Sequence, residues 1–548
     1  MTQSLRLALI NRARRFRGSA FITITIIFFA LALASPEVAS AQNGPPLFSY
    51  EELVRLSEEE TLSAPLAAKL KTLLTTPFVN NSATARGIRP LKPSSLRLGG
   101  KFLRVAQWNI ERGLEFEAVA AALADGERFA ALLDRKKYPR GEGRANVLRQ
   151  AALLKEADVI VLNEVDWGLK RSGYRNVAAE LAAALDMNYA YGVEFVEVDP
   201  VQLGTEQFAG AKESDRRELV RRIRVEPSRL RALHGTAILS RYLLENVRLV
   251  PFEFQGHDWY ADERKGVAPF ERGKRTVSER VFLEKVTREV RRGGRTTLFA
   301  DINDPEIPGG RATIVATHLE ARTEPKNRAR QLNELLSTLR DIPHPVILAG
   351  DMNTSTQDMT PTSLRREIKK RLGDERFWVE QGVKYATGVG LLLDVVKGGV
   401  SLSRTHGDPT VRSVKFVAEN PEAGFFDDLK DFRFADGGAF DFRGDAARTS
   451  NGRAGLLANS NERAKKGFTT TYAVSRTIGP TGKYKLDWIF VKPHPATGGG
   501  ERPYRFAPHF GRTLEELNNS VADRISDHNP VIVDLPFDEP PEKAKLKR

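Results

Sequence analysis

The sequence predicts an α/β protein in which helices cover layered β-sheets. From residue 101 onward, short apolar runs alternate with amphipathic helical patterns. Six of these apolar runs end at, or lead directly into, a polar residue able to bind a metal or a phosphate. Because a buried charge must be paired or must hold a metal, we expect the six strand ends to converge on one site.

The first 41 residues are expected to form a secretory signal peptide, which is removed from the mature protein. Five arginines precede an apolar run of 15 residues, from Ala20 to Ala34, and the small residues Ala39, Ser40 and Ala41 follow as a cleavage site. A membrane span usually needs about 18 or more apolar residues, so the run is short for an anchor. The sequence therefore predicts cleavage near Ala41 and export to the periplasm or the cell exterior, with an N-terminal membrane anchor as the alternative.

The charge of the chain favours an anionic partner. The net charge is +14, and residues 1–41 contribute +4 through five arginines and one glutamate, so residues 42–548 retain +10. Such a charge suits nucleic acid or an anionic membrane surface, while a generally basic protein without such a partner stays an alternative.

The absence of cysteine from the sequence limits the chemistry of the protein. Disulfides, thiolate metal sites and a cysteine nucleophile are excluded. Metal ligands must come from carboxylates, amides and the eight histidines. Such ligands suit hard divalent cations, so Mg²⁺, Mn²⁺ or Ca²⁺ is the expected ion.

Residues 42–100 are expected to be a helical extension and linker that packs on the main domain. Helical patterns cover 50–56 and 63–74, with Ser63 placed as an N-cap and leucines repeating along the second helix. Between residues 77 and 100, prolines and glycines indicate loops.

The main domain is expected to span residues 101–536, with a charged tail at 537–548. Its helical and strand-like patterns follow in this order: a helix at 145–156 and a strand at 158–163, a helix at 176–185 and a strand at 189–196, a strand at 235–240, and a helix at 325–339 before a strand that starts at 346. Alternation of this kind predicts sheets with helices outside them.

Long polar segments interrupt this pattern near 199–232, 253–297 and 354–483. Segments of this length are usually functional or disordered. The second segment is strongly basic between 271 and 295, which favours contact with nucleic acid. The third carries Phe425, Phe426 and Phe434, which either contact a membrane or fill a small core of the segment itself.

The polar residues at the strand ends provide the groups that phosphate-ester cleavage requires. This chemistry needs a hard cation, a base for the attacking water, donors to the non-bridging oxygens and a route for protonating the leaving group. Oxygen ligands of the kind that hard cations prefer are present at Asn109, Glu111, Glu164 and Asp527.

The remaining groups can take separate roles in the same reaction. Asp351 can orient the water while Asn353, two residues further on a segment expected to be extended, points to the same face and donates to the phosphate. The imidazoles of His318 and His528 can stabilise charge or transfer protons. Asp487 can hold His528 in one tautomer. Each motif alone also has a structural interpretation, such as a turn or a buried histidine bonded to a carbonyl, so the complete set carries the hypothesis.

The order of these motifs along the chain is informative. The motifs are Trp108-Asn109-Ile110-Glu111, Asn163-Glu164, the segment His234 to Arg241, Thr317-His318-Leu319, Gly350-Asp351-Met352-Asn353, Leu486-Asp487-Trp488-Ile489-Phe490, and Ser526-Asp527-His528-Asn529-Pro530. Together they resemble the ordered motifs of the endonuclease/exonuclease/phosphatase superfamily. The resemblance spans residues 101–536, and the three long segments lie outside it.

The resemblance implies a four-layer α/β/β/α sandwich of the deoxyribonuclease-I type, with two packed mixed β-sheets and helices on both outer faces. It implies a site at the strand ends that binds one or two Mg²⁺ or Mn²⁺ ions. By this analogy the site residues are catalytic Asp351, Asn353, His318, Asp487 and His528; phosphate-binding Asn109, Asn353, His318 and His528; and metal-binding Asn109, Glu111, Glu164 and Asp527.

We therefore expect an exported, metal-dependent phosphoesterase of the nuclease type that hydrolyses a phosphodiester by attack of water. One alternative keeps this chemistry but acts on a phospholipid or a small phosphoester, such as sphingomyelin or an inositol phosphate, and would bring a membrane surface as partner. Another is a catalytically inactive binding protein, although such a module has no need of Asp351, Asp487 and His528 together. No obligate protein partner is evident from the sequence.

Overall fold

The structure, a computed structural model, describes residues 44–95, 98–206, 217, 220–264, 288–354, 423–442, 470–478, 481–494 and 505–538. The expected signal peptide, most of the three long polar segments and most of the charged tail lie outside the described residues. All described residues belong to the unit from Asn43 to Arg548. Within the part of the chain that the structure describes, no helix combines the length and apolar character needed to cross a membrane.

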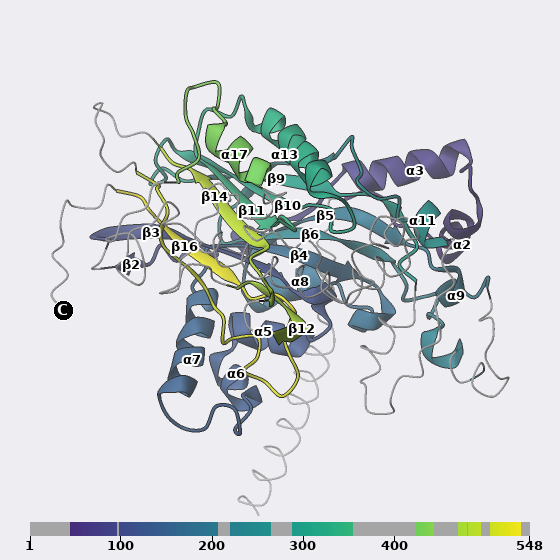
Figure 1. Ribbon diagram of the computed structural model, residues 1–548, viewed down its shortest axis with the longest axis horizontal. Coiled ribbons are helices and arrows are strands. Elements are labelled where there is room, and N and C mark those ends of the chain that lie inside the picture. Colours follow the sequence, from purple (N-terminus) through teal and green to yellow (C-terminus); the bar gives the residue numbers. More distant parts are fainter. Residues whose placement is uncertain are drawn as a thin grey trace, which may run out of the picture. The chain divides into compact units, whose positions relative to one another are not determined.

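The described strands form two mixed β-sheets and a separate β-hairpin (Figure 1). The larger sheet has the order β1 (Phe78–Asn80), β5 (Asn188–Glu197), β6 (Leu233–Ser240), β4 (Val159–Trp167), β3 (Gly100–Asn109), β16 (Val531–Pro536) and β15 (His509–Thr513), with β2 (Ser94–Ser95) paired to β3 and β8 (Arg291–Gly293) paired to β5. The smaller sheet has the order β14 (Asp487–Lys492), β11 (Val346–Asp351), β10 (Arg311–His318), β9 (Thr296–Asn303) and β7 (Leu244–Pro251). The hairpin joins β12 (Tyr472–Ile478) and β13 (Thr481–Tyr484).

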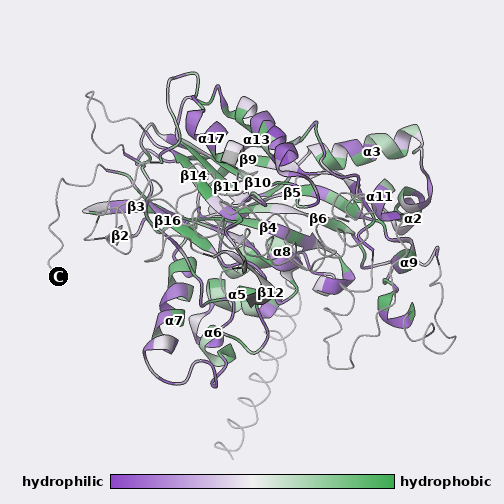
Figure 2. Cartoon of the chain, in the orientation of Figure 1, coloured by the Kyte–Doolittle hydropathy of each residue, from purple (hydrophilic) through white to green (hydrophobic). Residues whose placement is uncertain are grey.

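The apolar side chains of the strands pack into three cores, which define four layers. In β4, Val159 and Val161 face the core between the two sheets, whereas Ile160 and Leu162 face the core under the helices of the larger sheet. Because neighbouring side chains of a strand point to opposite faces, a run of four apolar residues is buried on both sides. The predicted α/β/β/α sandwich is therefore confirmed, and Figure 2 shows the hydrophobic strands between helices that carry hydrophilic residues.

Helices cover the outer face of each sheet (Figure 1). The larger sheet is covered by α5 (Phe116–Ala124), α6 (Gly126–Leu132), α7 (Glu142–Lys155) and α8 (Val177–Ala184), whose buried residues share its core. The smaller sheet is covered by α13 (Pro325–Leu339) and α17 (Ala423–Asp431). Shorter described elements are α4 (Ser82–Ala85), η1 (Glu111–Gly113), η2 (Lys170–Ser172), α9 (Pro200–Leu203) and α11 (Ala261–Arg264).

The N-terminal extension contains the two expected helices, α2 (Tyr50–Glu58) and α3 (Ala64–Thr75). A capping box begins α2, in which Ser49 accepts from the Glu52 amide and the Glu52 carboxylate accepts from Ser49. Ser63 holds the N-cap position of α3 but forms no side-chain cap, because its hydroxyl accepts from Arg55 instead. Buried leucines of both helices join the core of the larger sheet.

Two expectations about the polar segments are corrected by the described residues. Phe425, Phe426 and Phe434 are buried with Trp488 and Phe490 in the core of the smaller sheet. They therefore neither face a membrane nor form a separate core within their own segment. The end of the basic segment is also structured, because β8 pairs with β5 and β9 begins at Thr296. Strand pairing could not be read from the many arginines there.

The sheet register brings the polar strand ends together. In the larger sheet Asn109 pairs with Asn163 on parallel strands. In the smaller sheet His318 pairs with Asp351, and Asp351 pairs with Asp487 on the next strand. Ligand sites in open α/β sheets lie outside the carboxyl ends of parallel strands. Asn109, His318 and Asp351 are the last residues of β3, β10 and β11, and the antiparallel strand β14 begins at the same edge with Asp487.

Gly350 is expected to be essential for this alignment, because a Cβ atom there would lie 1.8 Å from the backbone oxygen of Thr317. We predict that Gly350→Ala lowers the free energy of unfolding by about 3 kcal/mol or more, since neighbouring strands must separate. Gly126→Ala is the matched control, because a Cβ at Gly126 meets nothing within 4 Å. Urea denaturation checks both variants, and equal midpoints for Gly350→Ala and Gly126→Ala would contradict the prediction.

Candidate active site

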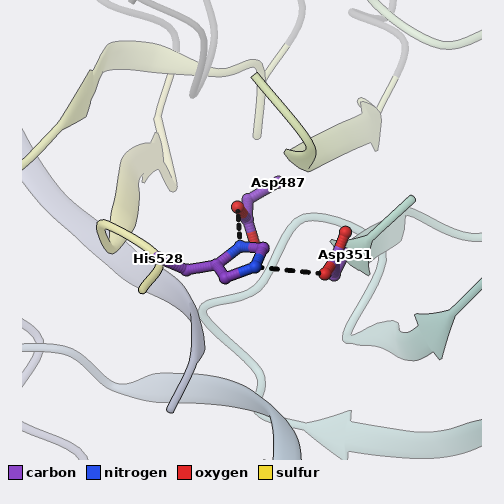
Figure 3. A group of neighbouring side chains, drawn as sticks. All are labelled: Asp351, Asp487 and His528. Carbon is purple, nitrogen blue, oxygen red and sulfur yellow. Dashed lines mark hydrogen bonds and ion pairs between the residues drawn. The ribbon is translucent and has the colours of Figure 1, made fainter. Parts of the chain in front are cut away.

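A buried histidine lies between two buried carboxylates (Figure 3). The Nδ1 atom of His528 hydrogen-bonds to Asp487 Oδ2 at 2.7 Å, and its Nε2 atom lies 3.7 Å from Asp351 Oδ2. The ligand atoms of the three residues all lie within 4.8 Å of one another. The carboxylate of Asp487 thereby fixes the imidazole, so that Nε2 points toward Asp351.

The charges of this trio are strongly coupled. Although burial favours the neutral imidazole, the carboxylates of Asp487 and Asp351 raise the pKa of His528 well above its usual value. Burial, together with the charge of Asp487, raises the pKa of Asp351 to about 7 against the opposing effect of His528. The carboxylates thus favour the imidazolium form of His528, and burial moves Asp351 into the range in which a general base works.

Buried amide side chains hold these carboxylates in place. Gln107 Nε2 donates to Asp487 Oδ1 at 3.0 Å and to Asn163 Oδ1 at 3.1 Å. Asn163 Oδ1 also accepts from the backbone N–H of Asp351 at 2.9 Å. Asn109 Nδ2 donates to Asp351 Oδ2 at 3.1 Å. Gln107 was not recognised in the sequence, although it precedes Asn109 by two residues and so shares its strand face.

Two of the residues expected to bind metal, Glu164 and Asp527, lie beside this trio. A β-bulge directs the side chain of Glu164 toward it. The register of β4 against β6 shifts between Leu162 and Val165, and Glu164 has a φ of 52° in this bulge. Bulges near active sites commonly redirect a side chain. Glu164 Oε1 accepts from Asn109 Nδ2 at 3.3 Å, and Asp527 Oδ1 lies 3.9 Å from His528 Nε2.

Glu164 and Asp527 fit a hard divalent cation. Their side chains are 25% and 26% exposed, whereas Asp351 and Asp487 are 2% and 0% exposed. Burial and the charge of Glu164 raise the pKa of Asp527, so the two carboxylates repel each other. Two accessible, repelling carboxylates form the oxygen-rich donor set that Mg²⁺ or Mn²⁺ prefers.

The other two expected ligands are placed differently. Asn109 turns its amide nitrogen toward Glu164 and Asp351, while its Oδ1 atom accepts from the Glu111 backbone at 3.1 Å. Asn109 thus orders the two carboxylates. The Glu111 carboxylate lies 3.6 Å from Arg524. Through its contact with Glu164, Asn109 borders the proposed cation position.

Asn353 does not lie on an extended segment as expected. Strand β11 ends at Asp351, and Asn353 has a φ of 48°, in the left-handed region. Its backbone N–H donates to Asp351 Oδ1 at 2.8 Å, and its amide Nδ2 donates to the Leu319 carbonyl at 2.9 Å. The prediction of an extended segment was wrong because Asn, unlike most residues, readily adopts the left-handed conformation. In that conformation the backbone N–H of Asn353 reaches the Asp351 carboxylate. In this arrangement Asn353 orients Asp351.

His318 lies on the other side of Asp351. Its Nε2 atom is 3.6 Å from Asp351 Oδ2, and its Nδ1 atom is 2.7 Å from a guanidinium nitrogen of Arg295. Arg291 and Arg295 were expected to face nucleic acid, but they are 3% and 4% exposed and pair with Glu197 and Glu194. A single sequence does not reveal that such arginines are buried.

The last residues of the longest polar segment also belong to the site. Thr471 Oγ1 accepts from the amides of Leu486 and Asp487 at 2.8 and 3.2 Å, and its carbonyl accepts from the Asn529 amide at 2.6 Å. The ring of Tyr472 lies 4.9 Å from that of His528. This segment therefore fixes Asp487 and His528 relative to each other, which sequence reasoning missed.

Comparison with known proteins identifies the family of the chain. The model of the Endonuclease/Exonuclease/phosphatase family matches residues 106–528. Among solved structures, the chain is similar to an endonuclease/exonuclease/phosphatase from Beutenbergia cavernae (18% identity, 79% of this chain and 71% of that chain, TM-score 0.32). It is also similar to a 3'-5' exonuclease from Neisseria meningitidis (12% identity, 79% and 100%, TM-score 0.34). No curated protein matches the sequence.

If Glu164 and Asp527 hold the cation, neutralising either carboxylate should weaken binding. We predict that Glu164→Gln and Asp527→Asn each reduce the affinity for Mn²⁺ by about tenfold or more, measured by isothermal titration calorimetry. Asp523→Asn is the control, because Asp523 is exposed and four residues from Asp527. Unchanged affinity in both site variants would place the cation elsewhere.

Proposed function

Because the chain belongs to the endonuclease/exonuclease/phosphatase family, we propose that it is an exported, divalent-metal-dependent phosphodiesterase that cleaves nucleic acid by attack of water. One observation carries the chemistry: His528, bonded to Asp487, and Asp351 face each other beside the accessible carboxylates Glu164 and Asp527. These groups provide a base, a cationic donor and a cation site within one small volume.

Asp351 is the general base of the proposed reaction. It accepts hydrogen bonds from Asn109 and from the Asn353 backbone, which direct its carboxylate while its burial keeps it basic. In its ionised form it takes a proton from the attacking water. The amides around it cannot be deprotonated, so they hold its position without competing for that proton.

His528 donates from Nε2 to a non-bridging oxygen of the phosphate. Asp487 favours the imidazolium form of His528. The positive charge of this imidazolium stabilises the negative charge that develops on the phosphoryl oxygens in the transition state. When bound by Glu164 and Asp527, a divalent cation would neutralise further charge on the phosphoryl oxygens. The distance of 3.7 Å between His528 Nε2 and Asp351 Oδ2 exceeds a direct hydrogen bond, so Nε2 can donate to a phosphate oxygen placed beside Asp351.

The charge of the chain supports nucleic acid as the substrate. Residues 42–548 carry a net charge of +10, which attracts a polyanion over long range. Arg291 and Arg295 do not contribute to that attraction, because both are buried in ion pairs. A lipid substrate loses its main support, since the phenylalanines that would have touched a membrane are buried. Export rests on the sequence of residues 1–41.

We predict metal-dependent turnover of duplex DNA or RNA that exceeds turnover of sphingomyelin. The purified protein is incubated with and without Mg²⁺ and offered DNA, RNA, sphingomyelin and a generic phosphodiester. Asp351→Asn should reduce turnover by about a thousandfold or more, because it keeps the shape but removes the base. Asp523→Asn should match the wild type.

Other outcomes of this panel separate the alternatives. Turnover of sphingomyelin without turnover of nucleic acid would replace the proposed substrate by a lipid. No turnover of any substrate with Mg²⁺ or Mn²⁺ would favour a binding protein. Recovery of the protein in the extracellular or periplasmic fraction, with the mature N-terminus near Ala41, is expected; a retained leader would contradict export by cleavage.

The pH profile should report both titrating groups. With Asp351 as base, the logarithm of kcat/KM rises through about pH 7 as its carboxyl group ionises, and it falls at higher pH when His528 loses its proton. Asp487→Asn should move both limbs to lower pH, because the Asp487 charge raises the pKa of Asp351 and of His528. A profile without a rising limb between about pH 5 and about pH 8 would contradict the assignment of Asp351.

A further inference from the structure

The two histidines that flank Asp351 have opposite partners on Nδ1. His528 Nδ1 faces the carboxylate of Asp487 at 2.7 Å, whereas His318 Nδ1 faces the guanidinium of Arg295 at 2.7 Å. Both Nε2 atoms point to the same oxygen, Asp351 Oδ2, at 3.7 Å and 3.6 Å. The two histidines therefore place their Nε2 atoms in similar positions, but the group at Nδ1 is an anion for His528 and a cation for His318.

We propose that His318 acts as a neutral hydrogen-bond donor to the phosphate, with its proton fixed on Nε2 by Arg295, and that it does not protonate the leaving group. This inference rests on the proposed function for the identity of the ligand. Arg295 is a positioning residue, since it acts through His318 and does not reach the reacting atoms.

The tautomer follows from the donor inventory of arginine. A guanidinium offers only N–H donors and stays protonated in proteins. A contact of 2.7 Å between its nitrogen and His318 Nδ1 is a hydrogen bond only if Nδ1 accepts. The imidazole must then carry its proton on Nε2, which lies 3.6 Å from Asp351 Oδ2, beyond a direct hydrogen bond, and can donate to a phosphate oxygen placed beside Asp351.

Arg295 cannot easily turn away from His318. It is 4% exposed, and the nitrogen that faces His318 also donates to Glu194 Oε2 at 2.7 Å. Its Nε atom lies 3.4 Å from Glu320 Oε2, which accepts in turn from Trp259 at 2.8 Å. Its guanidinium carbon lies 5.2 Å from the ring centre of Phe195. These contacts from separate elements hold the donor at Nδ1.

The surrounding charges also oppose a second proton on His318. Cations or potential cations face it from several elements: Arg295 and Arg291 near β8 and β9, His234 on β6 and His528 before β16. Two carboxylates act in the other direction, Glu194 at 3.8 Å from Nδ1 and Asp351 at 3.6 Å from Nε2. Burial, reinforced by the cations, lowers the pKa of His318 well below its usual value.

Nitrogen-15 NMR of the purified protein labelled at histidine tests the tautomer without any substrate. The His318 resonances are assigned by their absence from His318→Gln. We expect the signature of a neutral imidazole protonated at Nε2, constant from about pH 5 to about pH 8. A proton on Nδ1, or a titration of His318 in that interval, would overturn the proposal.

Variants of the two buried arginines test the role of Arg295. In Arg295→Met, Nδ1 loses its donor and faces Glu194, so His318 should begin to titrate in the same interval. Arg291→Met is the matched control, because it removes a guanidinium of similar burial that lies over the same Phe195 ring, forms no hydrogen bond with His318 and lowers the pKa of His318 less than Arg295 does. An unchanged His318 spectrum in Arg295→Met would contradict the proposed role. If that variant fails to fold, the wild-type spectrum still decides the tautomer.

Glutamine replacements add a kinetic test, because a glutamine amide is a neutral donor. The turnover of His318→Gln should be about tenfold or more higher than that of His318→Ala, whereas His528→Gln and His528→Ala should be equally impaired. Equal impairment of the two His318 variants would remove the donor role. If no phosphodiester is turned over at all, the proposed function is wrong. The NMR spectrum then still decides the tautomer of His318, because it is recorded without substrate.

Discussion

The arrangement of this protein depends on the burial of several carboxylates at one edge of two packed sheets. Asp351 and Asp487 are register partners on neighbouring strands and are almost fully buried. Charges in such a place are unstable unless protons, cations or hydrogen-bond donors compensate them. His528 compensates both carboxylates from one side, and Gln107 and Asn109 donate to them from another. The accessible pair, Glu164 and Asp527, is partly compensated by Arg112 and His528, and a divalent cation bound there would add to that compensation.

Behind His318 a second buried network balances charge with arginines. Arg295 joins Glu194 and Glu320, and Arg171 joins Asp166 and Glu197. Arg295 links Glu194 on β5 of the larger sheet to Glu320, which follows β10 of the smaller sheet, whereas the group around Arg171 stays within the larger sheet. As a result, the two imidazoles favour different protonation states. The aspartate beside His528 favours the charged form, and the arginine beside His318 favours the neutral form.

The sequence predicted the layers well because strands buried on both faces need uninterrupted apolar runs, as in Val159 to Leu162. It also predicted which strand ends converge, and the structure brings His318, Asp351, Asp487 and His528 into one place. Gln107 and Arg295 escaped prediction because composition does not distinguish a buried polar side chain from a solvated one. Asn353 was expected in an extended conformation, since periodicity carries no information about a left-handed residue after a strand. Thr471 escaped notice because its contacts depend on the path of a long polar segment.

In the proposed mechanism, the cation binds between Glu164 and Asp527 while Asp351, Asp487 and His528 remain a proton-transfer and hydrogen-bonding unit. A crystal structure with Mn²⁺ and a non-hydrolysable phosphorothioate, recorded with anomalous diffraction, would locate the cation. We expect an anomalous peak that contacts Glu164 and Asp527, with a phosphate oxygen within hydrogen-bond reach of both His318 Nε2 and His528 Nε2. A peak coordinated instead by Asp351, Asp487 and His528, whose ligand atoms lie within 4.8 Å of one another, would contradict it.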